Sequence, residues 1–341
     1  MRIGVIVPDR CPNPLYRALM PMEELSRRGH TVGTAEMGKD GSLPPIEAFG
    51  DFDVVYFWRV YYQPIRRLAR KLQESGIAVI WDNDDNMTAI PRAAPTYRYY
   101  GGVRGQRAWG EMRTIIRMAD AVTTPSPTLA ELYRSVGQEH VHVIENYVPA
   151  VRPRLRTGNR SRIVIGWVAH SEHVVDLRTL GLTNVFRELL ERRPEVQLVS
   201  VGLPLGLSSP RYRHVGVIPL EQLASEVAQF DIGIAPLTDI EFNRSRSNIK
   251  VKEYAAQGVP WLASPVSPYA ELGERQGGRL VEDDRWLEGL HALVVDGAER
   301  DRLAANAAAW ARGETIQRNA HRWEEILGAA VQRARSAAVH G

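Results

Sequence analysis

The segment from residue 241 to residue 260, EFNRSRSNIKVKEYAAQGVP, combines polar side chains that could bind a nucleotide. It follows an apolar run with the character of a buried strand, and its second half has helical spacing. Ser247 or Asn248 can cap that helix, whose free N–H groups and positive dipole end suit a phosphate. Lys250 and Glu253 share a helix face, so the lysine could neutralise a diphosphate while the carboxylate accepts hydrogen bonds from ribose hydroxyls. The alternative is a surface ion pair worth about 0.2–0.5 kcal/mol.

A second cluster, Asp82, Asp84 and Asp85, directly follows the apolar run 77–81. Carboxylates at the end of a strand can orient an acceptor hydroxyl or take its proton. The Asp-x-Asp spacing also suits a divalent metal, which prefers hard oxygen ligands. Aspartates in this position often only cap the next turn. The pattern alone leaves these three interpretations open.

Two further groups of side chains could contact a ligand. Roughly twenty residues between 85 and 111 lack clear periodicity and carry aromatic and arginine side chains, among them Tyr97 and Arg98. These suit stacking on sugar rings or pairing with an anionic acceptor, with a solvated loop or single-stranded nucleic-acid binding as alternatives. His170 and His173 also follow an apolar run, and with no third ligand nearby they indicate ligand contact rather than a zinc site.

The elements that would position these residues alternate along the first half of the chain. Short apolar runs without polar alternation, separated by helical patterns, predict a parallel sheet covered on both faces. We expect strands at 3–7, 53–58, 77–81, 121–124 and 141–144, and helices at 14–28, 64–74, 106–118 and 127–135.

A second half repeats this alternation after a break. Residues 147–154 and the polar stretch 157–161 indicate a linker. We then expect strands at 162–168, 196–201, 214–218, 231–236, 259–264 and 279–281, followed by helices at 284–295, 298–312 and 316–338. Two doubly wound halves would form a cleft between the carboxyl ends of their sheets, where open α/β sheets bind ligands.

Composition narrows the class of protein. The 341 residues fit two domains at about 150 residues each, and 44% hydrophobic with 24% charged residues is a globular balance. A net charge of +3 gives no sign of a nucleic-acid partner, and one cysteine, Cys11, excludes an internal disulfide or a multi-cysteine metal site. No apolar run approaches the ~18 residues of a membrane span, and the amino-terminal stretch is too short for a signal peptide. We therefore expect a cytoplasmic enzyme.

Several familiar catalytic signatures are missing from the sequence. There is no G-x-G-x-x-G after the first strand, no Walker-type phosphate loop, no H-E-x-x-H and no G-x-S-x-G elbow. Dinucleotide oxidoreductases, P-loop enzymes, zinc proteases and α/β-hydrolases are thereby disfavoured.

Residues 247–264 resemble the nucleotide-sugar-binding helix and strand of GT-B glycosyltransferases, specifically family 4, the "group 1" retaining enzymes. Three other segments are similar to that family in order and spacing. They are the opening strand with Tyr16-Arg17 and LSRRGHTV at 25–32, IENYVP at 144–149, and IGWVAHSEH at 165–173. The resemblance spans nearly the whole chain.

The resemblance implies the α/β GT-B fold, in which two Rossmann-like domains face each other across a cleft. The first domain, 1–150, would bind the acceptor and the second, 151–315, the nucleotide sugar, while a helix at 316–341 would pack back on the first. The implied activity transfers a sugar from a nucleotide diphosphate donor to an acceptor hydroxyl, with retention. We expect no cofactor, metal or nucleic-acid partner, because protein cations and helix dipoles can neutralise the diphosphate. A homodimer is compatible with this scheme.

The resemblance also assigns three groups of site residues, each named here by its position in this sequence. The aspartate cluster would be catalytic, with Asp84 foremost and Asp82 and Asp85 beside it. The donor nucleotide would be bound by Gly166, His170, His173, Arg244, Asn248, Lys250 and Glu253. The acceptor would be bound by Tyr16, Arg59, Tyr97 and Arg98. An Asp-x-Asp metal site belongs to GT-A enzymes, which have a different fold.

The sequence departs from the family pattern at two places. The family has glutamates at the spacing of positions 245 and 253, but Ser245 stands at the first. The family's Gly-Arg…Lys pair for the diphosphate falls at 166–173, where the two histidines are the only candidate cations, and Lys250, Arg244 and Arg246 could supply the charge instead. These departures keep two alternatives open: a catalytically silent scaffold that binds a nucleotide sugar or a protein partner, and a nucleotide-sugar epimerase, which would act without an acceptor.

Overall fold

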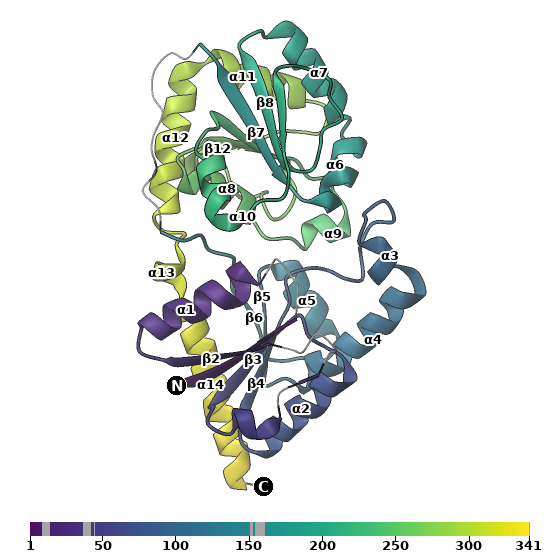
Figure 1. Ribbon diagram of the computed structural model, residues 1–341, viewed down its shortest axis with the longest axis vertical. Helices are drawn as coiled ribbons and strands as arrows, with labels where there is room; N and C mark the ends of the chain where they lie inside the picture. The colour runs from purple at the N-terminus through teal and green to yellow at the C-terminus, as the bar shows by residue number, and fades with distance from the viewer. Residues whose placement is uncertain (9–13, 37–41, 44, 151–152, 154–160, 341) are drawn as a thin grey trace.

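The computed structural model describes residues 1–8, 14–36, 42–43, 45–150, 153 and 161–340. Two α/β halves are stacked along the long axis of the molecule (Figure 1). Each half holds a parallel six-stranded sheet. Cys11 and most of the predicted linker lie outside the described residues.

The first sheet has the strand order β2-β1-β3-β4-β5-β6. Its strands are β1 (Arg2–Val7), β2 (Thr31–Glu36), β3 (Val54–Trp58), β4 (Ala78–Asp82), β5 (Ala121–Thr124) and β6 (Val141–Val143). Its helices are α1 (Met20–Arg27), α2 (Gln63–Glu74), α3 (Tyr97–Tyr100), α4 (Gly102–Met118) and α5 (Pro127–Ser135), with a short π-helix η1 (Leu15–Leu19) before α1 and a 3₁₀ turn η2 (Ile46–Phe49) before β3.

Both faces of this sheet are buried, which explains the unbroken apolar runs in its sequence. Along β3, Val55 and Phe57 pack into one core with α2, α4 and α5, whereas Val54 and Tyr56 pack into another with α1. Successive side chains of a strand point to opposite faces, so a strand covered on both sides must be apolar at every position.

The second sheet has the order β12-β11-β10-β7-β8-β9. Its strands are β7 (Ile163–Ala169), β8 (Val196–Gly202), β9 (Tyr212–Val215), β10 (Ile232–Ala235), β11 (Trp261–Ala263) and β12 (Gly278–Leu280). Its helices are α6 (Val174–Thr179), α7 (Leu182–Arg192), α8 (Leu220–Val227), α9 (Glu241–Arg244), α10 (Ile249–Ala256), α11 (Trp286–Val295) and α12 (Gly297–Ala311), with 3₁₀ turns η3 (Ser171–His173) and η4 (Glu274–Gln276).

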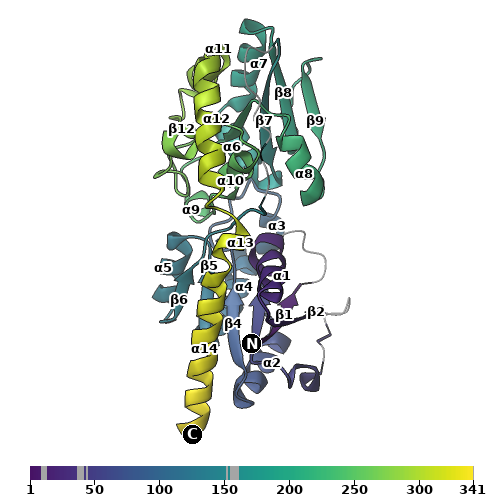
Figure 2. The ribbon, with the colours of Figure 1, turned by 90° about the vertical axis from the view of Figure 1, so that its left-hand side faces the viewer.

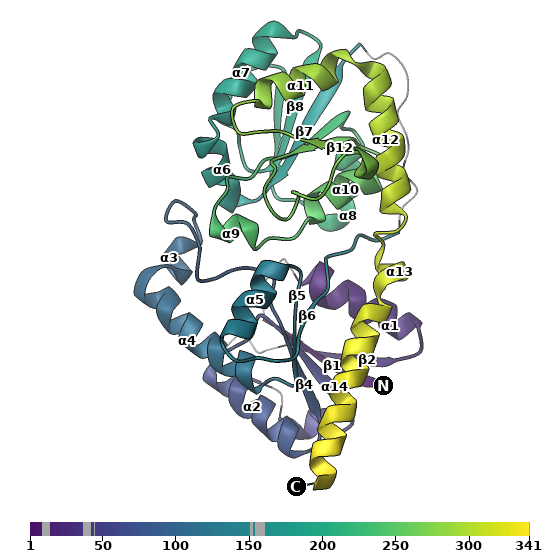
Figure 3. The ribbon, with the colours of Figure 1, turned by 180° about the vertical axis from the view of Figure 1, so that it is seen from behind.

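The chain returns to the first half through α13 (Ile316–Asn319) and α14 (His321–His340). Helix α14 runs along the first sheet, where Trp323 and Leu327 join the core that contains Val54 and Tyr56 (Figures 2 and 3). The predicted crossing of the C-terminal helix is confirmed.

The two segments that connect the halves are joined to each other. Val148 and Thr315 form a β-bridge between the outgoing and returning segments. Beside them the buried Lys252 ammonium lies 2.6 Å from Glu145 and 2.7 Å from Glu314. One lysine of the second half is therefore ion-paired with both segments that connect the halves.

Three elements differ from the sequence-based expectation. Strand β2 was not predicted, because it pairs only with β1 at the sheet edge and its residues TVGTAE are largely polar. The supposed loop at 85–111 contains α3 and the beginning of α4, which starts at Gly102, earlier than the helix predicted at 106–118; Gly102 and Gly105 weaken the helical pattern there. Strand β9 begins at Tyr212, earlier than expected.

Candidate functional site

A cavity of about 710 Å³ lies between the two halves. Its lining includes residues that directly follow strands of both sheets: Pro8 after β1, Arg59 after β3, Asn83 after β4 and His170 after β7. The carboxyl ends of the two sheets therefore meet at one cavity, as the alternation of strands and helices predicts. A volume of this size suits a small-molecule ligand.

On the second-half wall, the amino-terminal end of α10 reaches the cavity, with Ile249 and Lys250 in its lining. The Lys250 ammonium lies 3.0 Å from Glu253 Oε2. Tyr16, from the first half, donates a 2.6 Å hydrogen bond to Glu253 Oε1. Burial and the Glu253 charge raise the pKa of Tyr16 well above its usual value, so its hydroxyl keeps the proton. The Glu253 carboxylate thus joins the two walls.

A chain of buried polar groups presents Arg246 to the same cavity. The Arg246 guanidinium donates to His173 Nε2 at 2.8 Å, and His173 Nδ1 donates to Asp176 Oδ2 at 2.8 Å. Asp176 also accepts hydrogen bonds from the Thr238 backbone and from Asn243, both at 2.8 Å. Burial, with the Arg246 charge, lowers the pKa of His173, so a neutral imidazole accepts from the arginine and donates to the aspartate.

The two histidines do not act as cations, which corrects the expectation from the sequence. Burial, reinforced by the Lys250 charge, lowers the pKa of His170 to about 3. His173 is also neutral near pH 7 for the reason just given. Arg246 and Lys250 are therefore the positive groups on this wall.

On the first-half wall, the Arg59 guanidinium is bonded to two carboxylates. Its Nε donates to Asp84 Oδ1 at 2.7 Å, and its Nη2 is ion-paired with Asp85. Arg59 has φ 54°, the only positive value at a non-glycine residue among the described positions. Such a backbone costs about 1–3 kcal/mol and tends to occur at functional sites.

These two carboxylates have different proton affinities. Burial raises the pKa of Asp84 to about 6; the charge of Arg59 opposes this shift, and the carboxylates of Asp85 and Asp82 add to it. Burial also disfavours ionised Asp85, but the charges of Arg59 and Arg246 outweigh it and hold the pKa of Asp85 below its usual value. One carboxylate of the pair can therefore gain and lose a proton near neutral pH while the other stays charged.

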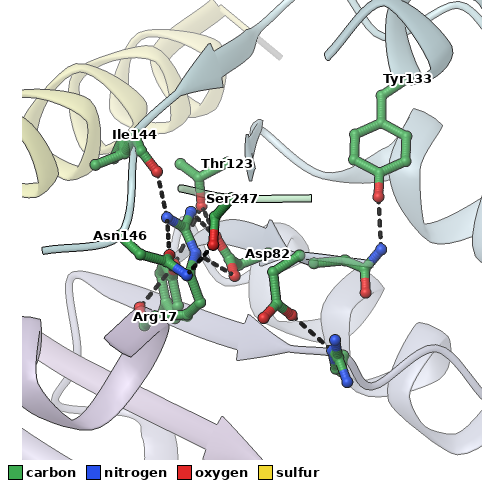
Figure 4. Close-up of polar contacts among 11 residues, drawn as sticks. Arg17, Asp82, Thr123, Tyr133, Ile144, Asn146 and Ser247 are labelled. Atoms are coloured by element: carbon green, nitrogen blue, oxygen red, sulfur yellow. Dashed lines mark hydrogen bonds and ion pairs between the residues drawn. The ribbon is translucent and has the colours of Figure 1, made fainter. Parts of the chain in front are cut away.

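Asp82 lies in the core and does not line the cavity, in contrast to its assignment from the sequence. Its side chain is fully buried and ion-paired with Arg17 at 2.5 Å, and it accepts a 2.6 Å hydrogen bond from Thr123. The Arg17 guanidinium also bonds to the Ile144 carbonyl and to Asn146 (Figure 4). This network holds η1 against β4 and the first interdomain segment, so Asp82 has a structural position.

Five other assigned residues also lie outside the lining of the cavity. Gly166 is inside β7, where a Cβ would come within 2.1 Å of Phe230, so close packing requires a glycine there. The exposed Arg244 pairs with Asp239, and Asn248 donates to Glu145. The remaining two are Tyr97 and Arg98, in α3.

Ser245 faces the first half of the molecule and not the cavity. It is fully buried, and its hydroxyl accepts a 3.1 Å hydrogen bond from Asn86. Its carbonyl accepts a 2.8 Å bond from Ser126, the residue that caps α5. The position at which the resembling family has a glutamate is here a contact between the two halves.

The cavity also contains residues outside the three groups assigned from the sequence, although one of them, Tyr100, belongs to the aromatic segment that was expected to contact a ligand. Its first-half end includes Tyr61, Tyr62, Tyr100, Met87 and Met112. Tyr61 and Tyr62 follow the carboxyl end of β3 closely, and the rule that ligands bind at strand ends could have found them. Tyr100 and Met87 lie in the segment at 85–111 taken for a loop, Tyr100 within α3 and Met87 in a turn, whereas Met112 lies in the predicted helix at 106–118.

Over the part of the chain that the structure describes, no group of three or more His, Cys, Asp or Glu side chains is arranged to hold a metal ion. Within the same residues, no helix is both long and apolar enough to span a membrane.

Solved structures resemble the whole chain at low sequence identity. HepE from Anabaena, in complex with UDP and glucose, has a TM-score of 0.66 and 15% identity, over 96% of this chain and all of that one. Sucrose-phosphate synthase from Thermosynechococcus elongatus has a TM-score of 0.62 and 14% identity, over 100% of both chains. A putative UDP-N-acetylglucosamine 2-epimerase from Listeria monocytogenes has a TM-score of 0.58 and 13% identity, over 97% of both.

No family model and no curated protein sequence matches the chain. The structural likeness therefore concerns the fold. Two parallel six-stranded sheets, flanked by helices and facing each other across a cavity, make this chain a GT-B fold, and its structural neighbours include nucleotide-sugar glycosyltransferases.

Proposed function

We propose that the protein is a glycosyltransferase that moves a sugar from a nucleotide diphosphate donor to an acceptor hydroxyl, with retention and without a bound metal. One observation carries the proposal: Arg246, Lys250 and the amino-terminal end of α10 line a cavity together with the Glu253 carboxylate. Cations and helix N–H groups suit a diphosphate, and a carboxylate one turn along the helix suits ribose hydroxyls.

The donor would be held by the second half. Arg246 and Lys250 neutralise the diphosphate and stabilise the charge that develops on it as the sugar leaves, a task that elsewhere falls to a metal. His173 and Asp176 keep the Arg246 guanidinium in place. Glu253 accepts from the ribose, with Tyr16 fixing one of its oxygens. His170 supplies a neutral imidazole beside the diphosphate.

The acceptor would be held by the first half, with Asp84 at the reacting hydroxyl. For retention, the acceptor oxygen approaches the anomeric carbon on the same face from which the diphosphate leaves. The new bond from that oxygen to the carbon forms as the bond to the diphosphate oxygen breaks, and the diphosphate leaves with the electron pair. The hydroxyl proton passes to Asp84, whose raised pKa suits a base near neutral pH. Arg59 holds Asp84 and Asp85 in position.

The likeness to a putative epimerase favours a second candidate, an epimerase acting on a nucleotide sugar in the same cavity. A catalytically silent scaffold is the third. The transferase, the epimerase and a scaffold that binds a nucleotide sugar would all bind a nucleoside diphosphate and differ in what happens to the sugar, whereas a scaffold for a protein partner need not bind one.

A thermal-shift screen of nucleoside diphosphates and their sugars tests the shared requirement. A ligand at 100 times its Kd adds about 2.7 kcal/mol to the free energy of unfolding, so the matching donor should stand out. That donor is then incubated with and without mixed acceptors. Release of the diphosphate that depends on acceptor supports the transferase, isomerisation of the sugar without acceptor supports the epimerase, and binding without turnover supports the scaffold.

A further inference from the structure

The residues that the first half contributes to its end of the cavity include three tyrosine rings and two methionine thioethers besides its carboxylates. Tyr61, Tyr62 and Tyr100 supply the rings, and Met87 and Met112 the thioethers. The rings of Tyr61 and Tyr62 have their centroids 5.2 Å apart. Aromatic rings attract one another in offset or edge-to-face geometry, and methionine sulfur also favours contact with a ring.

Positive charge is scarce at this end. Of the described residues that line it, Arg59 alone carries a positive charge, and its guanidinium is bonded to Asp84 and Asp85. Arg98 does not line the cavity and stacks on Tyr99, 4.5 Å from the ring centroid. An anionic acceptor would therefore meet two carboxylates and no cation that is not already paired.

The amide at this end already has hydrogen-bond partners. Asn83 donates to the Tyr133 hydroxyl at 2.6 Å and to the Asp85 carbonyl at 2.7 Å. The Thr96 hydroxyl also lines this end and has no hydrogen-bond partner, so it can serve one acceptor hydroxyl. A sugar acceptor brings several hydroxyls, and each one buried without a partner costs roughly 1–3 kcal/mol. An acceptor with one reacting hydroxyl on an apolar ring avoids most of that cost.

We propose that the acceptor is a planar aromatic compound that reacts through a hydroxyl on its ring, a substrate class that rests on the proposed function. The ring packs among Tyr61, Tyr100 and Met87, which places its hydroxyl at Asp84. The hydroxyl proton passes to the Asp84 carboxylate, the ring oxygen bonds to the anomeric carbon, and the nucleoside diphosphate leaves with the electrons of the broken bond.

Calorimetry in the presence of UDP tests the proposed acceptor class by comparing the affinities of three small hydroxyl compounds. These are 2-naphthol, which is aromatic, cyclohexanol, which is apolar but not aromatic, and methyl α-glucoside, which is a sugar. We expect 2-naphthol to bind at least about tenfold more tightly than either of the others. Tyr61→Leu keeps apolar volume and removes the ring, so it should weaken 2-naphthol binding about 2- to 10-fold. Tyr99→Leu, on an exposed ring outside the cavity, is the matched control and should change nothing.

The outcomes separate this inference from the proposed function. If UDP binds but 2-naphthol binds no better than the glucoside, or if Tyr61→Leu and Tyr99→Leu behave alike, the acceptor class is wrong and the donor site stands. If neither UDP nor ADP, GDP, CDP or dTDP binds, the proposed function fails and the acceptor class falls with it.

Discussion

The two walls of the cavity hold their charged groups in opposite ways. On the second-half wall, the Arg246 guanidinium donates its hydrogen bond to a neutral histidine and not to a carboxylate, and its charge acts on Asp85 of the other wall. On the first-half wall, Arg59 is paired with two carboxylates, which neutralise its positive charge. From this difference we infer that the second-half wall suits an anion, and we propose that the first-half wall takes part in a proton transfer.

The sharpest test of this contrast changes the proposed base. Asp84→Asn keeps the shape of the side chain and a hydrogen-bond acceptor for Arg59 but cannot take a proton. We expect turnover to fall by about 10²–10⁴-fold while nucleoside diphosphate affinity stays nearly unchanged. Steady-state kinetics and calorimetry on the same preparation measure both. If nucleoside diphosphate affinity fell by as large a factor as turnover, Asp84 would belong to the donor site, and the proposed difference between the two walls would be wrong.

Asp82, two residues away, should respond differently because it belongs to the core. Asp82→Ala leaves the fully buried Arg17 guanidinium without its ion-pair partner. Breaking a buried pair in this way costs about 3–5 kcal/mol in the free energy of unfolding. Urea denaturation should show that loss for Asp82→Ala and less than about 1 kcal/mol for Asp84→Asn. Comparable stability in the two variants would contradict the separation of their roles.

These two aspartates also show how far the sequence could be used for prediction. The aspartate cluster directly follows the apolar residues of β4. Because parallel strands bring their carboxyl ends to one edge of a sheet, this position in the sequence was enough to predict that the cluster lies near the cavity. The direction of each side chain needed strand alternation as well: Asp82 shares the face of Ala78 and Ile80, which pack under α14. Its partner Arg17 lies 65 residues earlier in the sequence, a pairing that no local pattern gives.

Part of the second-half wall could also be predicted from local sequence patterns. Lys250 and Glu253 lie on one short helix, and helical spacing placed both on one face of it, but it left open whether that face lines a cavity or the surface. The neutral state of the histidines could not be predicted, because it depends on burial and on Arg246, which lies in a distant segment. Gly102 and Gly105 concealed only the start of α4, because the part of it that carries Met112 lies within the predicted helix at 106–118.

On the second-half wall, the substitution Glu253→Ala tests the proposed contact with ribose. Losing hydrogen bonds to a charged group costs about 1.5–3 kcal/mol, so nucleoside diphosphate affinity should drop by about 10- to 150-fold. The thermal midpoint without ligand is the control for folding, and it should drop somewhat, because the substitution also removes the buried carboxylate that accepts from the Tyr16 hydroxyl. Calorimetry is therefore run well below that midpoint. Unchanged affinity in calorimetry would remove Glu253 from the donor site.

The smallest expected effect concerns pH. Because Asp84 must be deprotonated to accept a proton and its pKa is about 6, kcat/KM should fall below pH 6 by about tenfold per pH unit. Both histidines have lowered pKa values, so His170→Gln should keep this limb of the profile. A limb that disappears in His170→Gln would assign the titration to the imidazole.

The central claim is that Arg246 on the second-half wall binds the diphosphate without a metal. Calorimetry with UDP in EDTA, on the wild type, Arg246→Leu and Arg244→Leu, tests it most directly. Arg244 is the matched control, since it lies two residues away but is exposed and paired with Asp239. We predict tight binding in EDTA, a loss of about 10- to 150-fold for Arg246→Leu, and no change for Arg244→Leu. Binding abolished by EDTA, or equal behaviour of the two arginine variants, would contradict the account.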